Sequence, residues 1–495
     1  MLFNSFSFLV FFIVVTALYY ILPFKIRWLL LLIASCIFYA YFIPIYILIL
    51  FATIIIDYIA GIKIENAKPK NKKAYLVISL IANIGILFYF KYFNFFIGNI
   101  NDLSVALGWN YSINILSIIL PIGLSFHTFQ AMSYTIEVYR GNQKAEKHFG
   151  IYALYVMYYP QLVAGPIERP QNILHQFHFK HNFDYKKISS GLKLMLWGFF
   201  KKLVIADNIA EIINPVFDAP NNYQGVSHVI AMVLFSFQIF CDFSGYSDIA
   251  IGASRVMGIE LMQNFRSPYF SKNIAEFWTR WHISLSTWFK DYVYIPMGGN
   301  RVSKKRLYFN LIFIFLLSGL WHGASWNFVI WGMLHGAYLI IGIYMIKKIT
   351  NVKSKIGIGT WQKVFTLAQI VSTFFLVSIA WVFFRVTNLN DAIYFLSKAF
   401  TAIPDYFSRF NNPGFMKIKP WLLESDRRII IMYFIIFSSI IIMEFVNYIE
   451  LKRSFDSYLT EKGKIKKWSF YLIITWFVLF FGAFHSNNEF IYFQF

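Results

Sequence analysis

The stretch LIFIFLLSGLWHGASW, residues 311–326, decides the fold class of this chain. It begins with the apolar run Leu311–Leu320 and then places His322 between Trp321 and Gly323. A titratable side chain at membrane depth costs roughly 2–3 kcal/mol or more unless it lines a cavity, so its presence there indicates a functional role. The stretch therefore predicts a membrane helix that leads to a functional site, with His322 as the first candidate.

The composition places the chain among integral membrane proteins. Of its 495 residues, 58% are hydrophobic and only 14% are charged, whereas soluble domains carry about 25% charged residues. A membrane helix needs about 20 apolar residues, and the apolar runs allow roughly 10 to 13 crossings. We therefore expect an all-α, multi-pass protein. The expected spans are Phe6–Leu22, Trp28–Ile62 (two segments around Pro44), Ala74–Ile97, Ile113–Ile136, Tyr152–Val163, Leu194–Ile213, Val226–Phe240, Leu307–Leu320, Val329–Ile346, Phe365–Phe384, Ile429–Val446 and Trp468–Phe484.

The formal net charge of +21 comes largely from basic clusters beside the apolar runs. Such placement is typical of the positive-inside rule and of attraction to anionic lipid head groups. A basic cytoplasmic mouth would also attract an anionic acyl donor such as a coenzyme A thioester. Nucleic-acid binding needs basic residues on an extended soluble face, and the sequence predicts no such domain. We expect membrane lipid, and no nucleic acid, as a partner.

The middle of the chain, from about Pro121 to Arg385, differs from both ends in its hydropathy pattern. Its apolar runs are shorter and are broken by polar, glycine and proline residues. Non-helical backbone at membrane depth is tolerated only where it is buried in protein or lines a wet cavity. We expect one domain with N-terminal helices over about 1–110, a catalytic core over about 113–385, and C-terminal helices and an aromatic tail over about 386–495.

A pair of carboxylates stands in the segment DFSGYSD, residues 242–248, just after an apolar run. Asp242 and Asp248 are compatible with a metal site or a carboxylate dyad, but a metal site needs further ligands at fixed spacing. Asp and Ser side chains commonly cap helices and form turns, and Gly245 permits a bend. We favour the cap and turn roles and expect no metal. Cys36 and Cys241 lie in apolar surroundings and are expected to be free thiols.

Residues 276–292 predict an amphipathic helix at the membrane interface. At 100° per residue, a belt of large apolar side chains falls on one face, with charges on the others. The belt consists of Trp278, Trp281, Leu285 and Trp288. His282 lies within this segment and is expected to be solvated or packed rather than catalytic.

His322 and His335 are 13 residues apart. In an unbroken helix this spacing gives about 20 Å of rise and about 220° of rotation. Both can serve one reacting bond only if the backbone breaks between them, for example at Gly323 or Gly332. We rank His322 first, and the alternative role of His335 is a helix–helix hydrogen bond beside Gly336.

Several segments, in this order, resemble the membrane-bound O-acyltransferase superfamily. They are closest to the bacterial branch that serves O-acetylation of alginate and peptidoglycan, with a teichoic acid D-alanyltransferase as a more distant relative. The matching stretches are PIGLSFHTFQAMSYTIEVYRG, YPQLVAGPIERP, QIFCDFSGYSDIAIGAS, NFRSPYFSKNIAEFWTRWHISLSTWFKDYVYIPMGGNR, GLWHGASWNFVIWGMLHG and WVFFR. Together they cover most of residues 121–385.

The resemblance implies a ring of tilted helices, some re-entrant or interfacial, around a central tunnel. It also implies an acyl thioester donor, such as acetyl-CoA, on the cytoplasmic side, and no bound cofactor. The histidine of the superfamily corresponds to His322, whose neutral imidazole would take a proton from an attacking hydroxyl. Trp321, Trp326 and Trp331 would wall the site from water. By motif, the tunnel, gate or donor contacts are Gln161, Glu168, Asp242, Ser244, Tyr246, Asp248, Arg280, Asn300, Trp321, Ser325, Trp326 and His335.

The aromatic tail NEFIYFQF, residues 488–495, has two interpretations. It suits an interfacial anchor. The resemblance implies a second role, because relatives have similar tyrosine-containing tails, in this subunit or in a small partner, that carry an acyl group to an extracytoplasmic transferase. We hypothesise that Tyr492 is acylated with His322 as base, since a phenol with a pKa of about 10 needs one.

The sequence therefore predicts an O-acyltransferase, foremost an acetyltransferase, of the bacterial cytoplasmic membrane. It would serve O-acetylation of peptidoglycan, alginate or another exopolysaccharide together with a periplasmic or extracellular O-acetyltransferase partner. The rival from another class is a transporter of an anionic or lipid-linked solute, which predicts inverted halves with discontinuous helices. A non-catalytic scaffold is a third alternative, and it would tolerate His322→Ala.

Overall fold

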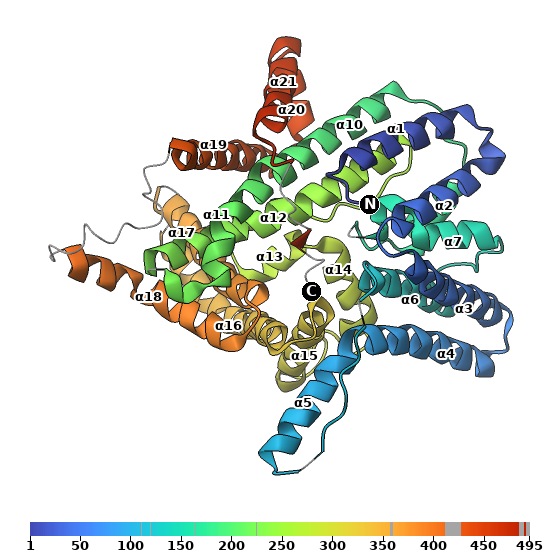
Figure 1. Ribbon diagram of the computed structural model, residues 1–495, viewed down its shortest axis with the longest axis horizontal. Helices are drawn as coiled ribbons and strands as arrows, with labels where there is room; N and C mark the ends of the chain where they lie inside the picture. Colours follow the sequence, from blue (N-terminus) through green and yellow to red (C-terminus); the bar gives the residue numbers. More distant parts are fainter. Residues whose placement is uncertain are drawn as a thin grey trace. The chain divides into compact units, whose positions relative to one another are not determined.

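The computed structural model describes residues 1–109, 111–118, 120–163, 165–223, 225–356, 360–410, 427–484 and 490–491. Within these residues the regular structure is helical and contains no strand (Figure 1). The all-α prediction is therefore confirmed. The residues group into two compact units. Unit 1 comprises Met1–Leu196 and Tyr246–Gln263, and unit 2 comprises Trp197–Gly245 and Asn264–Phe495.

Unit 1 contains the first part of the chain. Its helices are α1 (Phe6–Ile21), α2 (Phe24–Ala40), α3 (Ile47–Asn66), α4 (Pro69–Leu87), α5 (Phe93–Ala106), α6 (Leu124–Arg140), α7 (Phe149–Met157), α8 (Tyr159–Leu162), α9 (Pro170–Phe177) and most of α10 (Tyr185–Phe199). Helices α3, α4 and α6 lie side by side in Figure 1. Buried polar groups join α3 to α4, since Ser79 Oγ and Asn83 Nδ2 donate to the carboxylate of Asp57 at 2.6 and 2.9 Å. Such bonds hold helices together where no water competes for them.

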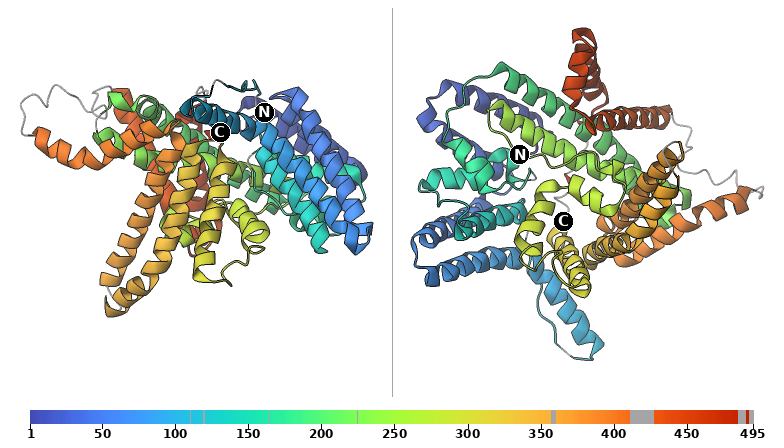
Figure 2. Two further views of the ribbon diagram at one scale, coloured as in Figure 1. Left: turned by 90° about the horizontal axis from the view of Figure 1, so that it is seen from below. Right: turned by 180° about the vertical axis from the view of Figure 1, so that it is seen from behind.

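Unit 2 contains the remaining helices. A π-helix, Phe200–Ala206, leads from α10 into α11. The helices are α11 (Asp207–Asp218), the greater part of α12 (Gly225–Val256), α13 (Ile274–Arg280), α14 (Ile283–Phe289), α15 (Lys304–His322), α16 (Trp326–Ile356), α17 (Thr360–Arg385), α18 (Leu389–Phe410), α19 (Arg427–Glu450), α20 (Phe455–Glu461) and α21 (Lys464–Phe481). Figure 2 shows α15, α16 and α17 packed side by side.

Helices α15 and α16 approach each other unusually closely because glycines meet backbone at their interface. A Cβ atom on Gly319 would lie 2.2 Å from the carbonyl oxygen of Phe328, and one on Gly332 would lie 2.2 Å from that of Phe315. Small residues allow membrane helices to pack backbone against backbone. Gly319 and Gly332 therefore permit the close packing of the hairpin that carries both candidate histidines.

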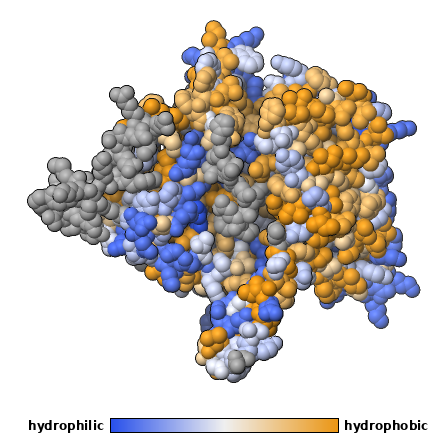
Figure 3. All heavy atoms as spheres, viewed as in Figure 1, coloured by the Kyte–Doolittle hydropathy of each residue, from blue (hydrophilic) through white to orange (hydrophobic). Residues whose placement is uncertain are grey.

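Six helical segments among the described residues are long and apolar enough to cross a membrane. They are Pro44–Asn66, Pro69–Ala106, Gly225–Val256, Trp326–Met345, Trp361–Arg385 and Ile430–Glu450, and the shorter apolar α1 accompanies them. Large apolar side chains of unit 1 face outward, including Phe6, Ile21 and Ile81, and Figure 3 shows apolar atoms over the helices of this unit. Surfaces of this kind suit contact with lipid.

The number of long spans is lower than the roughly 10 to 13 crossings expected from sequence, because interruptions divide several predicted spans. Residues 111–118 and 120–123 are not helical, so helix begins only at Leu124 within the predicted span Ile113–Ile136. The predicted span Tyr152–Val163 is split between α7 and α8. The predicted division of Trp28–Ile62 is confirmed, since a 3₁₀ turn beginning at Pro44 separates α2 from α3.

The expected bend at Gly245 is wrong. Helix α12 runs without interruption from Gly225 to Val256, so Asp242 and Asp248 lie in its interior and are neither caps nor turn residues. The glycine serves packing instead, because a Cβ at position 245 would lie 2.8 Å from the carbonyl oxygen of Gly198 in α10. It lets α10 and α12 approach within unit 2.

The single interfacial helix predicted over residues 276–292 is also wrong. The segment forms α13 and α14, separated at Trp281 and His282, and His282 has a left-handed backbone with φ of 43°. Trp281 and Trp288 are buried and do not form an exposed belt. The ring of Trp281 packs against Trp381 with centroids 5.0 Å apart, so tertiary packing overrides the 3.6-residue pattern.

Candidate active site

His322 is the last residue of α15, and the helix ends there because the chain turns back into α16. The backbone leaves helical geometry at Gly323 and re-enters it at Trp326. His322 is 4% exposed. His322 and His335 can lie near one another only if the helix breaks between them. The break occurs at Gly323 rather than at Gly332.

Trp331 lies between the two histidines. Its ring centroid is 5.0 Å from that of His322 and 4.9 Å from that of His335, with both imidazoles edge-on to the indole. The rings of Trp321 and Phe384 also contact His322, at 4.9 and 5.2 Å. His322 thus lies within a buried aromatic enclosure, which excludes water from the imidazole.

His335 is fully buried and takes its hydrogen bond from α13. The indole Nε1–H of Trp278 donates to His335 Nδ1 at 3.3 Å. A neutral imidazole that accepts at Nδ1 carries its proton on Nε2, and Nε2 has no hydrogen-bond partner among the residues that the structure describes. The expected helix–helix hydrogen bond therefore exists, and it joins α16 to α13. The protonated Nε2 of His335 is then a hydrogen-bond donor.

His282, which was expected to be solvated or packed rather than catalytic, is a third buried imidazole close to His322. The two ring centroids are 6.5 Å apart. Its Nδ1 lies 3.2 Å from Asn264 Oδ1, and its ring is edge-on to Phe243 at 4.7 Å. A non-glycine residue in the left-handed region costs energy and is often found at functional sites. No spacing rule in the sequence indicates this conformation.

A pocket of about 390 Å³ lies between α13, α14, α15 and α16. It is mostly apolar, and two of its lining residues, Trp278 and Phe315, also contact the ring of His335. Its shape and lining suit an apolar chain with a few polar groups, because hydroxyls of Ser286 and Ser318 border it. Ligand pockets commonly have this character.

A buried ionic cluster surrounds Asp242. Lys202 Nζ lies 2.8 Å from Asp207 Oδ1 and 2.7 Å from Asp242 Oδ1. Lys201 Nζ donates to Ser244 Oγ at 2.9 Å. Basic residues beside apolar runs were expected to orient membrane helices, whereas Lys201 and Lys202 are buried and bind polar side chains of α11 and α12. The sequence contains a signal for this burial, since the two adjacent lysines interrupt an apolar run.

The segment Phe490–Ile491 reaches this cluster. The backbone N–H of Ile491 donates to Asp242 Oδ2 at 2.7 Å, and the ring of Phe490 is edge-on to Phe243 at 5.8 Å. Both tail residues are buried. Tyr492, the proposed acyl carrier, lies outside the described residues.

Several other predicted site residues of unit 2 have different surroundings. Arg280 pairs with Glu276 at 2.7 Å on α13. Asn300 is exposed, and Trp326 is 57% exposed. Trp321 and Trp331 are buried, so they differ in burial from Trp326, whose part in walling the site stays a prediction. Ser325 is half-buried in the turn between α15 and α16.

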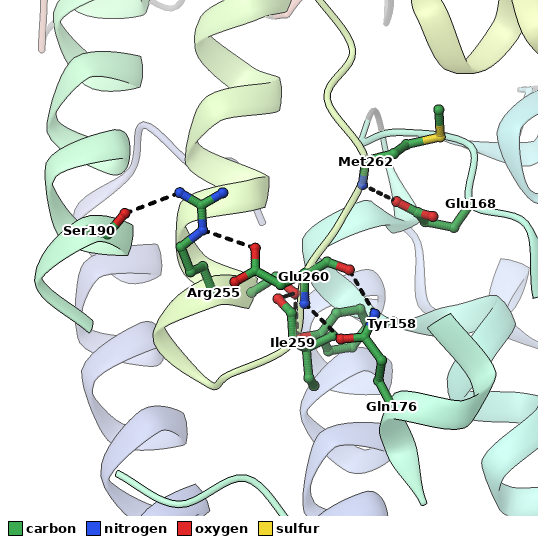
Figure 4. A network of polar contacts seen from close by, with 9 residues as sticks. Tyr158, Glu168, Gln176, Ser190, Arg255, Ile259, Glu260 and Met262 are labelled. Carbon is green, nitrogen blue, oxygen red and sulfur yellow. Dashed lines mark hydrogen bonds and ion pairs between the residues drawn. The ribbon is translucent and has the colours of Figure 1, made fainter. Parts of the chain in front are cut away.

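Four predicted site residues lie in unit 1. Gln161 donates to the carbonyl oxygen of Tyr155 at 2.7 Å, Tyr246 stacks on Phe3 at 4.4 Å, and Asp248 is half-buried. Glu168 accepts from the backbone N–H of Met262, as Figure 4 shows beside the pair Arg255–Glu260. Their part in substrate contact stays a prediction.

Glu168 predicts a pH dependence of stability. Its burial raises the pKa of the carboxyl to about 7, from an ordinary 4.5, although the Met262 N–H and Asn172 oppose this. The folded state therefore holds a proton that the unfolded state releases, and stability is lost as the pH rises through about 7, on the order of 3 kcal/mol in all. We expect the melting temperature in detergent to fall more steeply between about pH 5 and pH 7.5 for the wild type than for Glu168→Gln. Parallel curves would contradict this.

Comparison with known proteins decides the family. Residues 148–386 match the membrane-bound O-acyltransferase family. The chain is 39% identical over 396 residues to a probable alginate O-acetylase of Pseudomonas aeruginosa, covering 79% of this chain and 73% of that protein. The chain belongs to the membrane-bound O-acyltransferase family. The resemblance read from the sequence motifs is thereby confirmed.

Two further proteins to which this membrane-bound O-acyltransferase is similar have different acceptors in their names. A peptidoglycan O-acetyltransferase of Helicobacter pylori is 38% identical over 393 residues, which cover 73% of this chain and 72% of that protein. A teichoic acid D-alanyltransferase of Streptococcus thermophilus is 32% identical over 240 residues, covering 46% and 58%. The prediction of an acyltransferase with a multi-pass helical fold is confirmed.

Proposed function

We propose that this acyltransferase moves an acetyl group from a cytoplasmic thioester, such as acetyl-CoA, across the bacterial cytoplasmic membrane for O-acetylation of a cell-surface polysaccharide. The names of two relatives support this choice of reaction, since one acts on alginate and the other on peptidoglycan. The observation that carries the chemistry is the position of His322, buried at a helix break within an aromatic enclosure.

His322 is the general base in this proposal. The imidazole takes the proton of an attacking hydroxyl while the oxygen adds to the thioester carbonyl. The carbon–sulfur bond then breaks, an oxygen ester forms, and the imidazolium returns its proton to the departing thiolate. No proton is gained or lost overall. The buried rings of Trp321, Trp331 and Phe384 support this role because they would keep water from a bound thioester.

The attacking hydroxyl is assigned to Tyr492. The phenol has a pKa of about 10, so it needs a base at neutral pH. Support comes from the residues just before it, because Ile491 bonds to Asp242 and Phe490 packs on Phe243. Phe243 in turn contacts His282, whose ring is 6.5 Å from that of His322.

The donor and the final acceptor complete the scheme. The apolar pocket beside Trp278 would hold the arm of the thioester, with the Nε2–H of His335 as a donor near it. A separate extracytoplasmic O-acetyltransferase would take the acetyl group from Tyr492 and place it on peptidoglycan, alginate or another exopolysaccharide.

The test is bound surface acetate in a deletion strain. Acetate released by mild base from purified cell wall and exopolysaccharide is expected to fall in one polymer and to return when the wild-type chain is restored. Acetate unchanged in every polymer would contradict acetyl transfer and would favour transport of a solute.

A further inference from the structure

Asp242 holds two groups at once. One carboxylate oxygen faces the ammonium of Lys202 at 2.7 Å, and the other accepts the backbone N–H of Ile491 at 2.7 Å. All three residues are buried. A buried carboxylate is stable only when it is paired and hydrogen-bonded, and the tail amide therefore completes the surroundings of this one.

Lys202 fixes the direction of the carboxylate. Its ammonium is shared between Asp207 on α11 and Asp242 on α12. Because the Lys202 ammonium lies at Oδ1 of Asp242, the other oxygen, Oδ2, accepts the hydrogen bond from the tail. A charged acceptor forms a shorter and stronger hydrogen bond with a backbone N–H than a neutral one does.

The contact recognises the tail through its backbone. An N–H is present at every residue except proline, so this bond fixes where the segment sits without depending on the side chain of Ile491. A second contact sets the neighbouring residue, since Phe490 packs edge-on against Phe243, the residue after Asp242. One turn of α12 thus holds two consecutive tail residues.

We propose that the Lys202–Asp242 pair is the docking site of the tail, and that it positions the chain so that the residue after Ile491 is delivered to His322. Asp242 is then a positioning residue that acts through the backbone of Ile491. This proposal rests on the proposed function of Tyr492 as carrier, but the docking itself is measured without any acyl transfer.

Thiol labelling measures the docking directly. The full-length chain would carry alanine at Cys36 and Cys241 and the substitution Ile491→Cys, which keeps the backbone N–H. In this background the buried thiol is expected to react slowly with a maleimide, and Asp242→Ala should speed labelling at least tenfold. The matched control is Asp218→Ala, which removes a carboxylate of unit 2 that pairs with Arg385 and is itself exposed.

A second variant keeps the proposal testable if Asp242→Ala fails to fold. Ile491→Pro removes the N–H and leaves the ionic cluster intact, whereas Ile491→Val keeps the N–H. We expect Ile491→Pro to lower surface acetate at least tenfold at equal expression and monodisperse elution, and Ile491→Val to keep it.

Different results separate the two proposals. Equal labelling rates in the Asp242→Ala and parent chains would overturn the docking site, as would equal activity of Ile491→Pro and Ile491→Val while Tyr492→Phe is inactive. Faster labelling in Asp242→Ala, together with full activity of Tyr492→Phe, would uphold the docking site and overturn the role of Tyr492 as acyl carrier.

Discussion

His322→Ala is expected to lower acyl transfer by about 10²–10⁴-fold, the range typical of a lost general base. The imidazole is the titratable group at the helix break, and the rings of Trp331 and Phe384 enclose it. Removing it leaves the aromatic rings and the apolar pocket in place but removes the proposed acceptor of the hydroxyl proton. Activity would be measured as surface acetate per amount of folded protein in the membrane.

The matched control for this variant is His228→Ala. His228 is also fully buried in unit 2, and its ring packs edge-on against Phe395 at 4.7 Å. We expect this variant to lower the melting temperature while activity per folded molecule stays near that of the wild type. Equal activity of His322→Ala and wild type would favour a scaffold over a catalyst.

Tyr492→Phe is expected to reduce surface acetate to the level of the deletion strain. The substitution keeps the aromatic ring, and with it any role as an interfacial anchor, but removes the nucleophilic oxygen. The contacts of Phe490 and Ile491 are formed upstream of the changed residue and do not involve its hydroxyl. Loss of acetate would therefore report chemistry rather than tail docking.

The control for the tyrosine variant is Tyr448→Phe. Tyr448 is 51% exposed on α19, and its ring contacts Phe270. Loss of its hydroxyl should leave surface acetate unchanged. Intact acetate in the Tyr492→Phe strain would show that the phenol is not the carrier and would leave the aromatic tail as an anchor.

The sequence predicted the class of the fold and a helix break beside His322 because both depend on local chemistry. Long apolar runs identify membrane helices, and a histidine followed by Gly323 marks a polar break in one of them. Gly323 and Gly332 both permit a break, and the structure has it at Gly323. Trp331 lies between the two histidines because α16 packs back against α15 after the break.

The sequence could not predict the contacts that long-range packing creates. Lys202 and Asp242 are 40 residues apart, and nothing in either local pattern pairs them. The predicted helix divides at Trp281, whose ring packs on Trp381 from a distant part of the chain. Gly245 was expected to bend a helix, yet its role is to admit α10, which depends on a neighbour that spacing does not reveal.

The proposed transfer of acetyl to Tyr492, with His322 as the base, is tested most directly by the mass of the tail peptide. Purified full-length protein would be incubated with acetyl-CoA, digested, and searched for the peptide that contains Tyr492. We predict one acetyl group on the Tyr492 oxygen in the wild type and none in His322→Ala. An unmodified Tyr492 in a wild type that still acetylates its polymer, or equal acetylation in both proteins, would contradict the account.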